Sequence, residues 1–324
     1  MKNKPEVVLY DSLMGRECNY SSTKDWWTIG YKFSFDEDSE GPRKIKWIYG
    51  GGCQPCAVER MREVSEEGVE VALFTDKDII SPMVDKIKTK YKVAFLGECR
   101  SIHPWAYDLI LRVENKFDYI FTFDDKLLER GGKYVSGVPP AGTCLKREHI
   151  GIHPKSKFSA LIASETGLDV VVSKEAKGHF LRHIIARALK KRKYDVDLWG
   201  RAYRPFEHGN RIVSLKDYYF SFAIMNASHK NYFTDILTDC FRTGTVPIFW
   251  GCENVGEFFN EKGIISFKTP EQLNKIISSL TVKDYYDRME YIQENFERVK
   301  EYFCTDDRLA EQMIKQGILK GGGK

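Results

Sequence analysis

The sequence predicts an α/β protein made of two Rossmann-like domains that face each other across a cleft. Short apolar runs alternate with amphipathic stretches along the whole chain, which is typical of parallel sheets with helices on both faces. This alternation is interrupted once, near residues 131–157. The length of 324 residues is that of two domains, at roughly 150 residues each.

The first half of the chain contains strand candidates that are short runs rich in β-branched and aromatic residues. The predicted strands are Val7–Tyr10, Ile45–Tyr49, Val69–Phe74, Val93–Leu96 and Tyr119–Phe123. Two helices are predicted between the last three of these strands, at Ile79–Lys90 and Trp105–Asn115.

The second half repeats the alternation. Its predicted strands are Ser159–Ala163, Val196–Trp199, Tyr218–Ile224, Val246–Trp250 and Ile264–Phe267. Its predicted helices are Lys174–Arg192, Asp235–Arg242, Val255–Asn260 and Pro270–Ser279. Thr269 is a suitable cap for the last of these, with Pro270 in its first turn. Residues 282–319 are predicted to be mostly helical, with Thr305 as a further cap.

The interruption between the halves is the predicted linker. Glycines and prolines cluster there, in Gly131-Gly132, Val138–Gly142 and His153-Pro154, and the periodicity is lost. We therefore expect a first domain at residues 1–150, a second at 151–319, and a flexible tail at 320–324. In open α/β sheets ligands bind at the carboxyl ends of the strands, so the cleft between the domains is the expected site.

Composition excludes several classes of function. The net charge of +4 is too small to make nucleic acid the main partner, and no apolar run approaches the roughly 20 residues of a membrane span. The N-terminus lacks the pattern of a signal peptide, so we expect a cytoplasmic protein. Eight cysteines are too few for a disulfide framework. The single CxxC pair, Cys53 and Cys56, is interpreted as reduced cysteines, with a disulfide or a metal site as alternatives.

Common nucleotide and metal motifs are absent from the sequence. There is no GxGxxG, no GxxxxGK[ST] and no HExxH. Asp36-Glu37-Asp38 fits a DxD metal pattern but lies in a charged stretch that we interpret as a solvated loop. The basic run Lys190–Lys193 is interpreted as a solvated helix end, where cations suit the helix dipole. We expect neither a metal nor a cofactor.

The most informative stretch is Tyr218–Phe267, in which a strand, a polar loop, a capped helix and a second strand follow one another. It resembles the donor-binding motif of the family 10 glycosyltransferases, the α-1,3/4-fucosyltransferases. The residues that match the family's pattern are Tyr218, Phe220, Ala223, Asn226, Tyr232, Thr234, Leu237, Gly244, Thr245, Val246, Pro247, Gly251 and Asn254.

The resemblance extends toward the N-terminus. The strand Phe158–Ser164 followed by the helix with Arg182 and Leu189, and then Val196–Gly200, is similar to the family's order of elements. In the first half, Val93–Glu98 and Phe117–Asp124 resemble the family's acceptor domain, in which a strand ends in a Gly-Glu pair. Residues 1–65 show no such similarity.

The resemblance implies an inverting glycosyltransferase of the two-Rossmann (GT-B) type that needs no metal. The first domain would present a glycan acceptor, and the second would hold a nucleotide sugar, typically GDP-fucose. Glu98 would be the general base, with Glu114 and Asp124 as alternatives. A guanidinium suits a diphosphate, so Arg182 would contact the donor, with Arg187 as the alternative. The remaining donor-binding residues would be Asn226, Lys230, Tyr232, Thr234 and Asp235.

Two departures from the family's pattern bear on the donor. The family's Thr-Glu-Lys reads Thr234-Asp235-Ile236 here, so a cation near the phosphates is missing, and Lys230 or Lys177 is the expected substitute. The glutamate that precedes the family's asparagine is Met225. A transferase for another nucleotide sugar, and a non-catalytic nucleotide- or glycan-binding protein, are therefore the alternative functions.

Overall fold

The structure is a computed structural model that describes residues 6–10, 46–50, 69–143, 145, 147–164, 177–206, 210–302 and 305–319. The chain divides into two compact units: unit 1 comprises Met1–Pro140 and Cys304–Lys324, and unit 2 comprises Ala141–Phe303. The acidic stretch 36–38, the Cys53/Cys56 pair and the tail 320–324 lie outside the described residues.

Unit 1 is built on a parallel sheet with the strand order β2-β1-β3-β4-β5-β6. The strands are β1 (Glu6–Tyr10), β2 (Lys46–Gly50), β3 (Val69–Thr75), β4 (Thr89–Phe95), β5 (Tyr119–Thr122) and β6 (Tyr134–Ser136). The helices among the described residues of this unit are η2 (Asp76–Ile80), α2 (Met83–Lys86), α3 (Pro104–Val113), η3 (Glu114–Lys116), α4 (Asp125–Leu128) and α10 (Thr305–Lys315).

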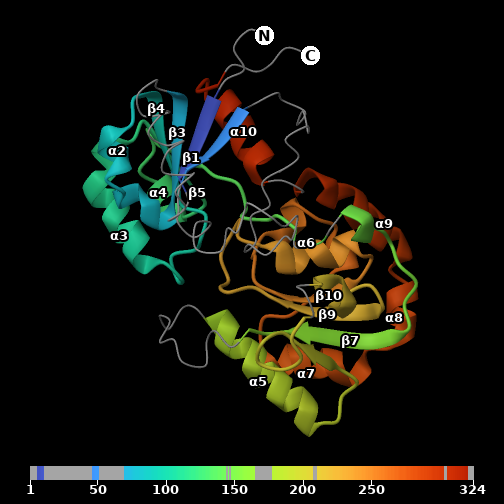
Figure 1. The fold of residues 1–324 in the computed structure, drawn as a ribbon. Coiled ribbons are helices and arrows are strands. Elements are labelled where there is room, and N and C mark those ends of the chain that lie inside the picture. Colours follow the sequence, from blue (N-terminus) through green and yellow to red (C-terminus); the bar gives the residue numbers. More distant parts are fainter. Residues whose placement is uncertain are drawn as a thin grey trace. The chain divides into compact units, whose positions relative to one another are not determined.

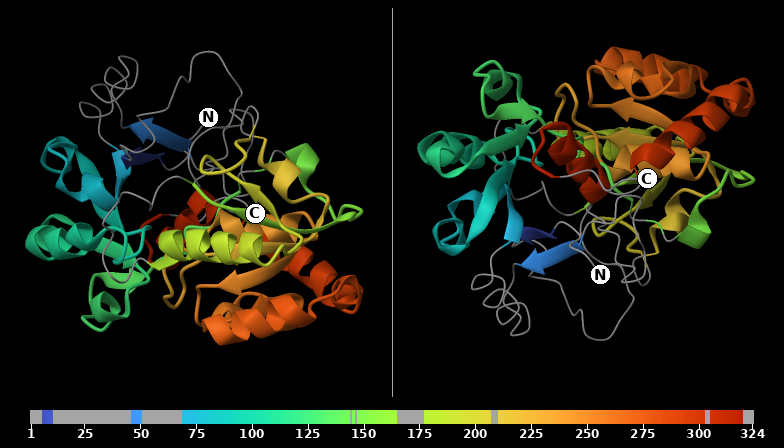
Figure 2. Two further views of the ribbon diagram at one scale, coloured as in Figure 1. Left: turned by 90° about the horizontal axis from the view of Figure 1, so that it is seen from below. Right: turned by 90° about the horizontal axis from the view of Figure 1, so that it is seen from above.

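The sheet of unit 1 is covered on both faces because successive strand residues point to opposite sides. Ala72 and Phe74 of β3 belong to a core with residues of α2, α3 and α4. Val71 and Leu73 belong to a second core that includes Leu309 of α10. Figures 1 and 2 show α10 against the sheet, on the face opposite α3.

Unit 2 also contains a parallel sheet, with the order β11-β10-β9-β7-β8. Its strands are β7 (Lys157–Ile162), β8 (Asp197–Trp199), β9 (Tyr218–Ile224), β10 (Val246–Trp250) and β11 (Ile265–Ser266). Its α-helices are α5 (Lys177–Lys191), α6 (Asp235–Arg242), α7 (Pro270–Ser279), α8 (Val282–Tyr286) and α9 (Met289–Arg298). Short 3-10 turns are η4 (Arg147–His149), η6 (Arg211–Ser214), η7 (Val255–Glu257), η8 (Glu261–Gly263) and η9 (Val299–Tyr302).

Helices lie on both faces of this sheet as well. Leu189 of α5 and Leu273 of α7 share a core with Phe220 and Phe222 of β9. Figure 1 shows α5 and α7 on one side of the sheet and α6 on the other. The predicted α/β fold with doubly wound parallel sheets is therefore confirmed.

The topology places a ligand crevice in each unit. In unit 2 the chain leaves β7 toward the edge strand β8 but leaves β9 toward β10, so the connections diverge between β7 and β9. In unit 1 the same divergence occurs between β1 and β3. Ligands bind to open α/β sheets at the carboxyl ends of the strands beside such a switch point.

Several elements differ from the prediction. The predicted helix Ile79–Lys90 is split at Pro82 into η2 and α2, and the alternation from Thr89 onward continues as β4. The predicted helix Val255–Asn260 is only the 3-10 turn η7. Strand β6 was not predicted, because its short segment follows two glycines in the predicted linker.

The boundary between the units also differs from the predicted one. It lies between Pro140 and Ala141, within the Gly/Pro-rich segment, rather than after residue 150. Residues 305–319 were predicted in the second domain but pack in unit 1, where Leu309, Met313 and Leu319 complete the second core. The apolar residues of α10 thus cover a sheet whose last strand, β6, ends at Ser136, far earlier in the chain than Thr305.

Candidate active site

In unit 2 the candidate site lies at the carboxyl ends of β7 and β9, where α5 begins. The first turn of α5 packs on the backbone that follows β9, and the Gly178 amide donates to the carbonyl oxygen of Asn226 at 2.9 Å. A Cβ at residue 178 would lie 1.7 Å from the carbonyl oxygen of Met225, so only glycine fits. This close approach brings the positive end of the α5 dipole to the loop after β9.

Arg182 and Asn226, both predicted as donor-binding residues, are brought together in this crevice. Arg182 is only 5% exposed. Its Nε donates to the carbonyl oxygen of Ile224 at 2.9 Å, and its Nη2 donates to the same oxygen and, at 3.0 Å, to Oδ1 of Asn226. The guanidinium thus fixes the end of β9 as well as placing a positive charge there.

A neutral histidine lies beside this charge. Nη1 of Arg182 is 3.3 Å from Nδ1 of His179, in the first turn of α5. Burial, reinforced by the charges of Arg182 and His183, lowers the pKa of His179 to about 4. A neutral ring with Nδ1 as acceptor suits this place, because a second cation would oppose both the arginine and the helix dipole.

We expect this histidine to make the chain less stable in acid. Between about pH 6.5 and pH 4 the unfolded chain binds a proton at residue 179 that the folded chain refuses, so the free energy of unfolding falls as the pH falls through this window. Because the ring is partly exposed, we expect on the order of 1–2 kcal/mol. Urea denaturation at pH 7 and pH 4.5 should show that His179→Gln loses less of its free energy of unfolding at the lower pH than the wild type does. Equal losses in the wild type and the variant would contradict the lowered pKa of His179.

The polar loop after β9 is tied to the loop after β10. Ser228 Oγ donates to the carbonyl oxygen of Gly251 at 2.7 Å. Asn231, which has a positive φ of 58°, donates its amide to Oδ1 of Asn254, and Nδ2 of Asn254 donates to Oδ1 of Asn231, both at 2.8 Å. These bonds hold two loops together at the carboxyl end of the sheet. Asn254 was recognised as a motif position, but its pairing with Asn231 was not predicted.

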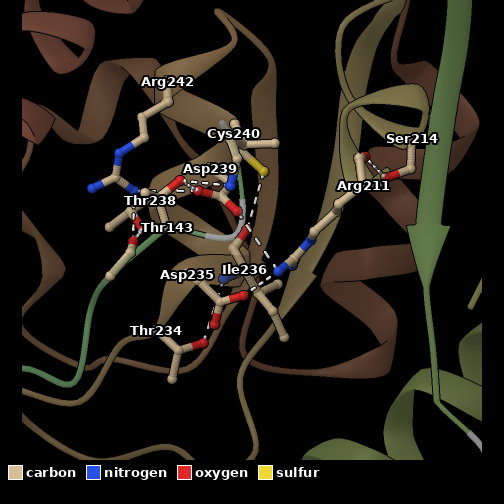
Figure 3. A network of polar contacts seen from close by, with 12 residues as sticks. Thr143, Arg211, Ser214, Thr234, Asp235, Ile236, Thr238, Asp239, Cys240 and Arg242 are labelled. Carbon is tan, nitrogen blue, oxygen red and sulfur yellow. Dashed lines mark hydrogen bonds and ion pairs between the residues drawn. The ribbon is translucent and has the colours of Figure 1, made fainter. Parts of the chain in front are cut away.

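The N-terminus of α6 carries two further predicted residues. Thr234 caps the helix, with Oγ1 accepting from the amide of Ile236 at 3.4 Å. Asp235 forms an ion pair with Nη1 of Arg211, which also lies 3.7 Å from Oδ2 of Asp239 (Figure 3). Arg211 was not predicted, since nothing in the sequence connects η6 with a helix more than twenty residues later.

The network in Figure 3 continues below the surface. Asp239 is fully buried, and its Oδ1 accepts from Thr143 at 2.6 Å and from Nη1 of Arg242 at 3.3 Å. Arg242 also donates to the carbonyl oxygens of Gly142 and Tyr302, each at 2.7 Å. Asp235 therefore stands at the outer end of a chain of alternating charges that anchors α6.

The remaining positions of the predicted donor site differ in their exposure to solvent. Lys230 is exposed on the loop after β9. Tyr232 is fully buried, so its side chain is a core residue of unit 2. Ile236, which occupies the position of the family's lysine, is partly buried in the first turn of α6.

In unit 1 the predicted base Glu98 follows β4, beside the switch-point strand β3. Its backbone is held at both ends: its amide donates to Oδ1 of Asp76 at 3.1 Å, and its carbonyl oxygen accepts from the hydroxyl of Tyr107 at 2.7 Å. Its own Oε1 accepts from the amide of Cys99 at 3.0 Å. Burial raises the pKa of Tyr107 well above its usual range, so this hydroxyl stays a donor. Glu98 is thus a partly exposed carboxylate with a fixed backbone.

A histidine and a tryptophan follow Glu98 at the start of α3. The rings of His103 and Trp105 are 5.3 Å apart, and Trp105 is 37% exposed. Burial lowers the pKa of His103, which keeps the imidazole neutral near neutral pH, while the charge of Glu98 acts in the opposite direction. An exposed aromatic ring therefore accompanies the carboxylate on this edge of unit 1.

The two alternative carboxylates are engaged in structural pairs. Asp124 caps α4 and binds Arg100 through two hydrogen bonds, of 2.8 and 3.0 Å. Glu114 accepts from Tyr134 and Arg130, and the hydrogen bond from Tyr134 is the main reason why the pKa of Glu114 is lowered. It lies before β5, at the edge of the sheet opposite to Glu98. All three carboxylates are partly exposed, but Glu114 and Asp124 are each bound to an arginine.

No group of three or more His, Cys, Asp or Glu side chains among the described residues is arranged to hold a metal ion. Within the same residues, no helix combines the length and the apolar character that a bilayer crossing requires. The expected metal independence stays a prediction.

Comparison with known proteins bears on the identity of the chain. Residues 163–313 match the family described as "Glycosyltransferase family 10 (fucosyltransferase) C-term". No protein with curated annotation matches the sequence.

Solved structures of glycosyltransferases share the fold at low sequence identity. A crystal structure of an alpha1,3-fucosyltransferase has 16% identity and a TM-score of 0.51, over 100% of this chain and 92% of that one. One with GDP-fucose has 14% identity and a TM-score of 0.52, over 100% of this chain and 94% of that one. An alpha-glucosyltransferase in complex with UDP and DNA has 10% identity and a TM-score of 0.52, over 97% of this chain and 99% of that one.

The match begins directly after β7, covers α5, β9, α6 and β10 around the crevice of unit 2, and ends within α10 of unit 1. The chain is a fucosyltransferase-like glycosyltransferase that carries the C-terminal domain of glycosyltransferase family 10.

Proposed function

We propose that the chain transfers fucose from GDP-fucose to a hydroxyl group of a glycan, with inversion at the anomeric carbon. The observation that carries the proposal is the family 10 match over the crevice of unit 2, where Arg182, Asn226 and the first turns of α5 and α6 gather at the ends of β7 and β9. The solved structure with GDP-fucose supports the donor. In the described part of the chain, Cys99, Cys240 and Cys252 are buried free thiols, as expected for the reducing cytoplasm that we propose as its location.

The donor's diphosphate would bind in unit 2. Helix N-termini bind anions through their free amides, and α5 adds the charge of Arg182. Because Arg182 is nearly buried, water screens its charge weakly, and this strengthens its attraction for a phosphate. Asn226, Thr234 and Asp235 would contact the sugar or the ribose, and exposed Lys230 would supply the cation that Ile236 lacks. Tyr232 would act by supporting the loop.

The acceptor would bind in unit 1. Glu98 would take the proton from the acceptor hydroxyl as its oxygen forms the new bond to the anomeric carbon. The bond from that carbon to the phosphate oxygen breaks at the same time, and the electron pair leaves with the nucleoside diphosphate. The cations and helix N-termini of unit 2 stabilise this leaving group, so we propose that no metal is needed. The exposed ring of Trp105 offers a surface on which a sugar ring can stack.

A donor screen tests this proposal. GDP should raise the thermal midpoint of the chain more than UDP or dTDP does, because a ligand that binds only the native state stabilises it. Mass spectrometry should then detect fucose transfer from GDP-fucose to a pooled oligosaccharide mixture, at a rate that a chelator leaves unchanged. Ile236 and Met225 favour a second candidate, a transferase for another nucleotide sugar. Preference for UDP or dTDP would select it, and binding without turnover would indicate a non-catalytic protein.

We expect Arg182→Ala to weaken GDP-fucose binding tenfold or more, on the order of 1.4 kcal/mol for a charge-assisted contact. Titration calorimetry measures the binding. Arg187→Ala is the matched control, because Arg187 is an exposed arginine of the same helix. The affinity of this variant for GDP-fucose should stay near that of the wild type. Unchanged binding in a folded Arg182→Ala protein would show that the arginine serves only to hold the end of β9.

A further inference from the structure

Asp76 is the first residue after β3 and has an unusual backbone. Its φ is +39°, one of three positive values among the non-glycine residues that the structure describes. Aspartate and asparagine tolerate this left-handed region better than other side chains with a Cβ. Asp76 is also only 4% exposed. A buried carboxylate on a strained backbone needs a compensating interaction.

The compensation comes from the segment that follows the neighbouring strand, β4. Oδ1 of Asp76 accepts from the amide of Gly97 and from the amide of Glu98, each at 3.1 Å. The ladder between β3 and β4 ends at Thr75 and Phe95, so these amides lie beyond the last backbone pair. The side chain of Asp76 therefore takes the place of a strand carbonyl and extends the ladder by two donors.

The second of these two amides belongs to Glu98, the candidate general base. With its amide on Asp76, its carbonyl on Tyr107 and Oε1 on the Cys99 amide, Glu98 is held at three points. Asp76 and Glu98 also lie at the same edge of the sheet. Asp76 follows β3 and Glu98 follows β4, and because these strands are parallel neighbours, their carboxyl ends are adjacent. The contact between the two residues is thus a consequence of the topology.

We propose that Asp76 is a positioning residue for the transfer reaction, which fixes the backbone of Gly97 and Glu98 so that the Glu98 carboxylate meets the acceptor hydroxyl in a productive geometry. The inference rests on the proposed role of Glu98 as base. Asp76 itself does not touch substrate in this role. Small misplacements of a reacting group cost about 10²-fold in rate, so turnover should depend on this contact.

Two substitutions separate the hydrogen bonds from the backbone strain. Asp76→Gly tolerates the positive φ but offers no acceptor, so the fold should survive while the two amides are released. Asp76→Asn keeps an oxygen acceptor and also tolerates the positive φ. The assay is GDP release from saturating GDP-fucose with a pooled oligosaccharide acceptor, and GDP binding is measured alongside.

We expect kcat to fall about 10- to 100-fold in Asp76→Gly with GDP affinity unchanged, and to return to within about threefold of wild type in Asp76→Asn. A purely structural role would lower the thermal midpoint and leave kcat unchanged when it is measured well below that midpoint. A kcat for Asp76→Gly within threefold of wild type would overturn the inference, and so would an Asp76→Asn protein as slow as Asp76→Gly. If Asp76→Gly does not fold, Asp76→Ala takes its place, because alanine also offers no acceptor.

A combination with Glu98→Gln distinguishes this inference from the proposed function. If Asp76 acts through Glu98, adding Asp76→Gly to Glu98→Gln should reduce turnover much less than it does in the wild type. An active Glu98→Gln protein would mean that the base assignment fails. An inactive Glu98→Gln protein with a fully active Asp76→Gly protein would mean that the base stands and the positioning role fails.

Discussion

Glu98→Gln should lower kcat about 10²- to 10⁴-fold while GDP-fucose binding survives, because glutamine keeps the size of the side chain and removes its basicity. The Cys99 amide that now donates to Oε1 can donate to the amide oxygen of glutamine, so we expect the thermal midpoint to change little. The measurement is single-turnover transfer to a pooled oligosaccharide acceptor, which isolates the chemical step from product release.

Glu114→Gln is the matched control for this experiment. Glu114 lies in the same unit before β5, and its carboxylate is paired with Tyr134 and Arg130. Its loss should leave kcat near the wild-type value and affect only stability, by an amount typical of a partly exposed ion pair. If Glu98→Gln retained more than about a tenth of the wild-type rate of the chemical step, Glu98 would not be the base.

The long buried strands were predicted from the sequence, whereas a short strand and the packing of the last helix were not. Apolar runs such as Val71–Phe74 and Phe220–Ile224 are buried on both faces, and this makes them conspicuous in a sequence. Strand β6 is short and half-exposed, so it carries no such signal. The position of α10 in unit 1 depends on contacts between distant parts of the chain, which the local pattern of an amphipathic helix does not encode.

The candidate site was predictable where a motif or a strand end marked it. Glu98 follows an apolar strand, and Arg182 and Asn226 belong to the recognised pattern; the structure brings the latter two within hydrogen-bonding distance. Asp76 follows the predicted strand Val69–Phe74 closely, much as Glu98 follows Val93–Leu96, so the same reasoning could have found it. Arg211 could not have been found in this way, because its pairing with Asp235 follows only from the packing of η6 on α6.

The buried arginine of α6 gives the largest stability effect that we expect. Arg242 is 1% exposed, and its removal takes the nearest cation from the buried carboxylate of Asp239 and one donor from each of two backbone carbonyls, of which that of Gly142 keeps the hydroxyl donor of Thr238. Breaking a buried ion pair from one side costs about 3–5 kcal/mol, because the remaining charge stays desolvated. We therefore expect Arg242→Met to lower the free energy of unfolding by about this amount, measured by urea denaturation.

The control is Arg298→Met in α9. Arg298 pairs with Glu294 at 2.5 Å in a helical i,i+4 arrangement, and both side chains are well exposed. Such pairs contribute about 0.3–0.5 kcal/mol, so the same chemical change should cost far less there. Similar losses in the two variants would show that the loss of a long side chain, rather than burial of the charge, sets the cost.

The location of Arg242 ties this stability effect to the proposed function. Its two carbonyl partners, Gly142 and Tyr302, lie near the first and last residues of unit 2. The guanidinium therefore connects α6 by hydrogen bonds to both ends of the chain segment that forms this unit. The same helix begins at Thr234 and Asp235, the residues proposed to contact the donor. Loss of the Arg242 contacts at the C-terminal end of α6 should therefore also disturb the position of Thr234 and Asp235 at its N-terminus. GDP binding by the folded fraction of Arg242→Met should weaken along with stability, whereas Arg298→Met should bind GDP like the wild type. Wild-type GDP affinity in a strongly destabilised Arg242→Met protein would confine the network to a structural role.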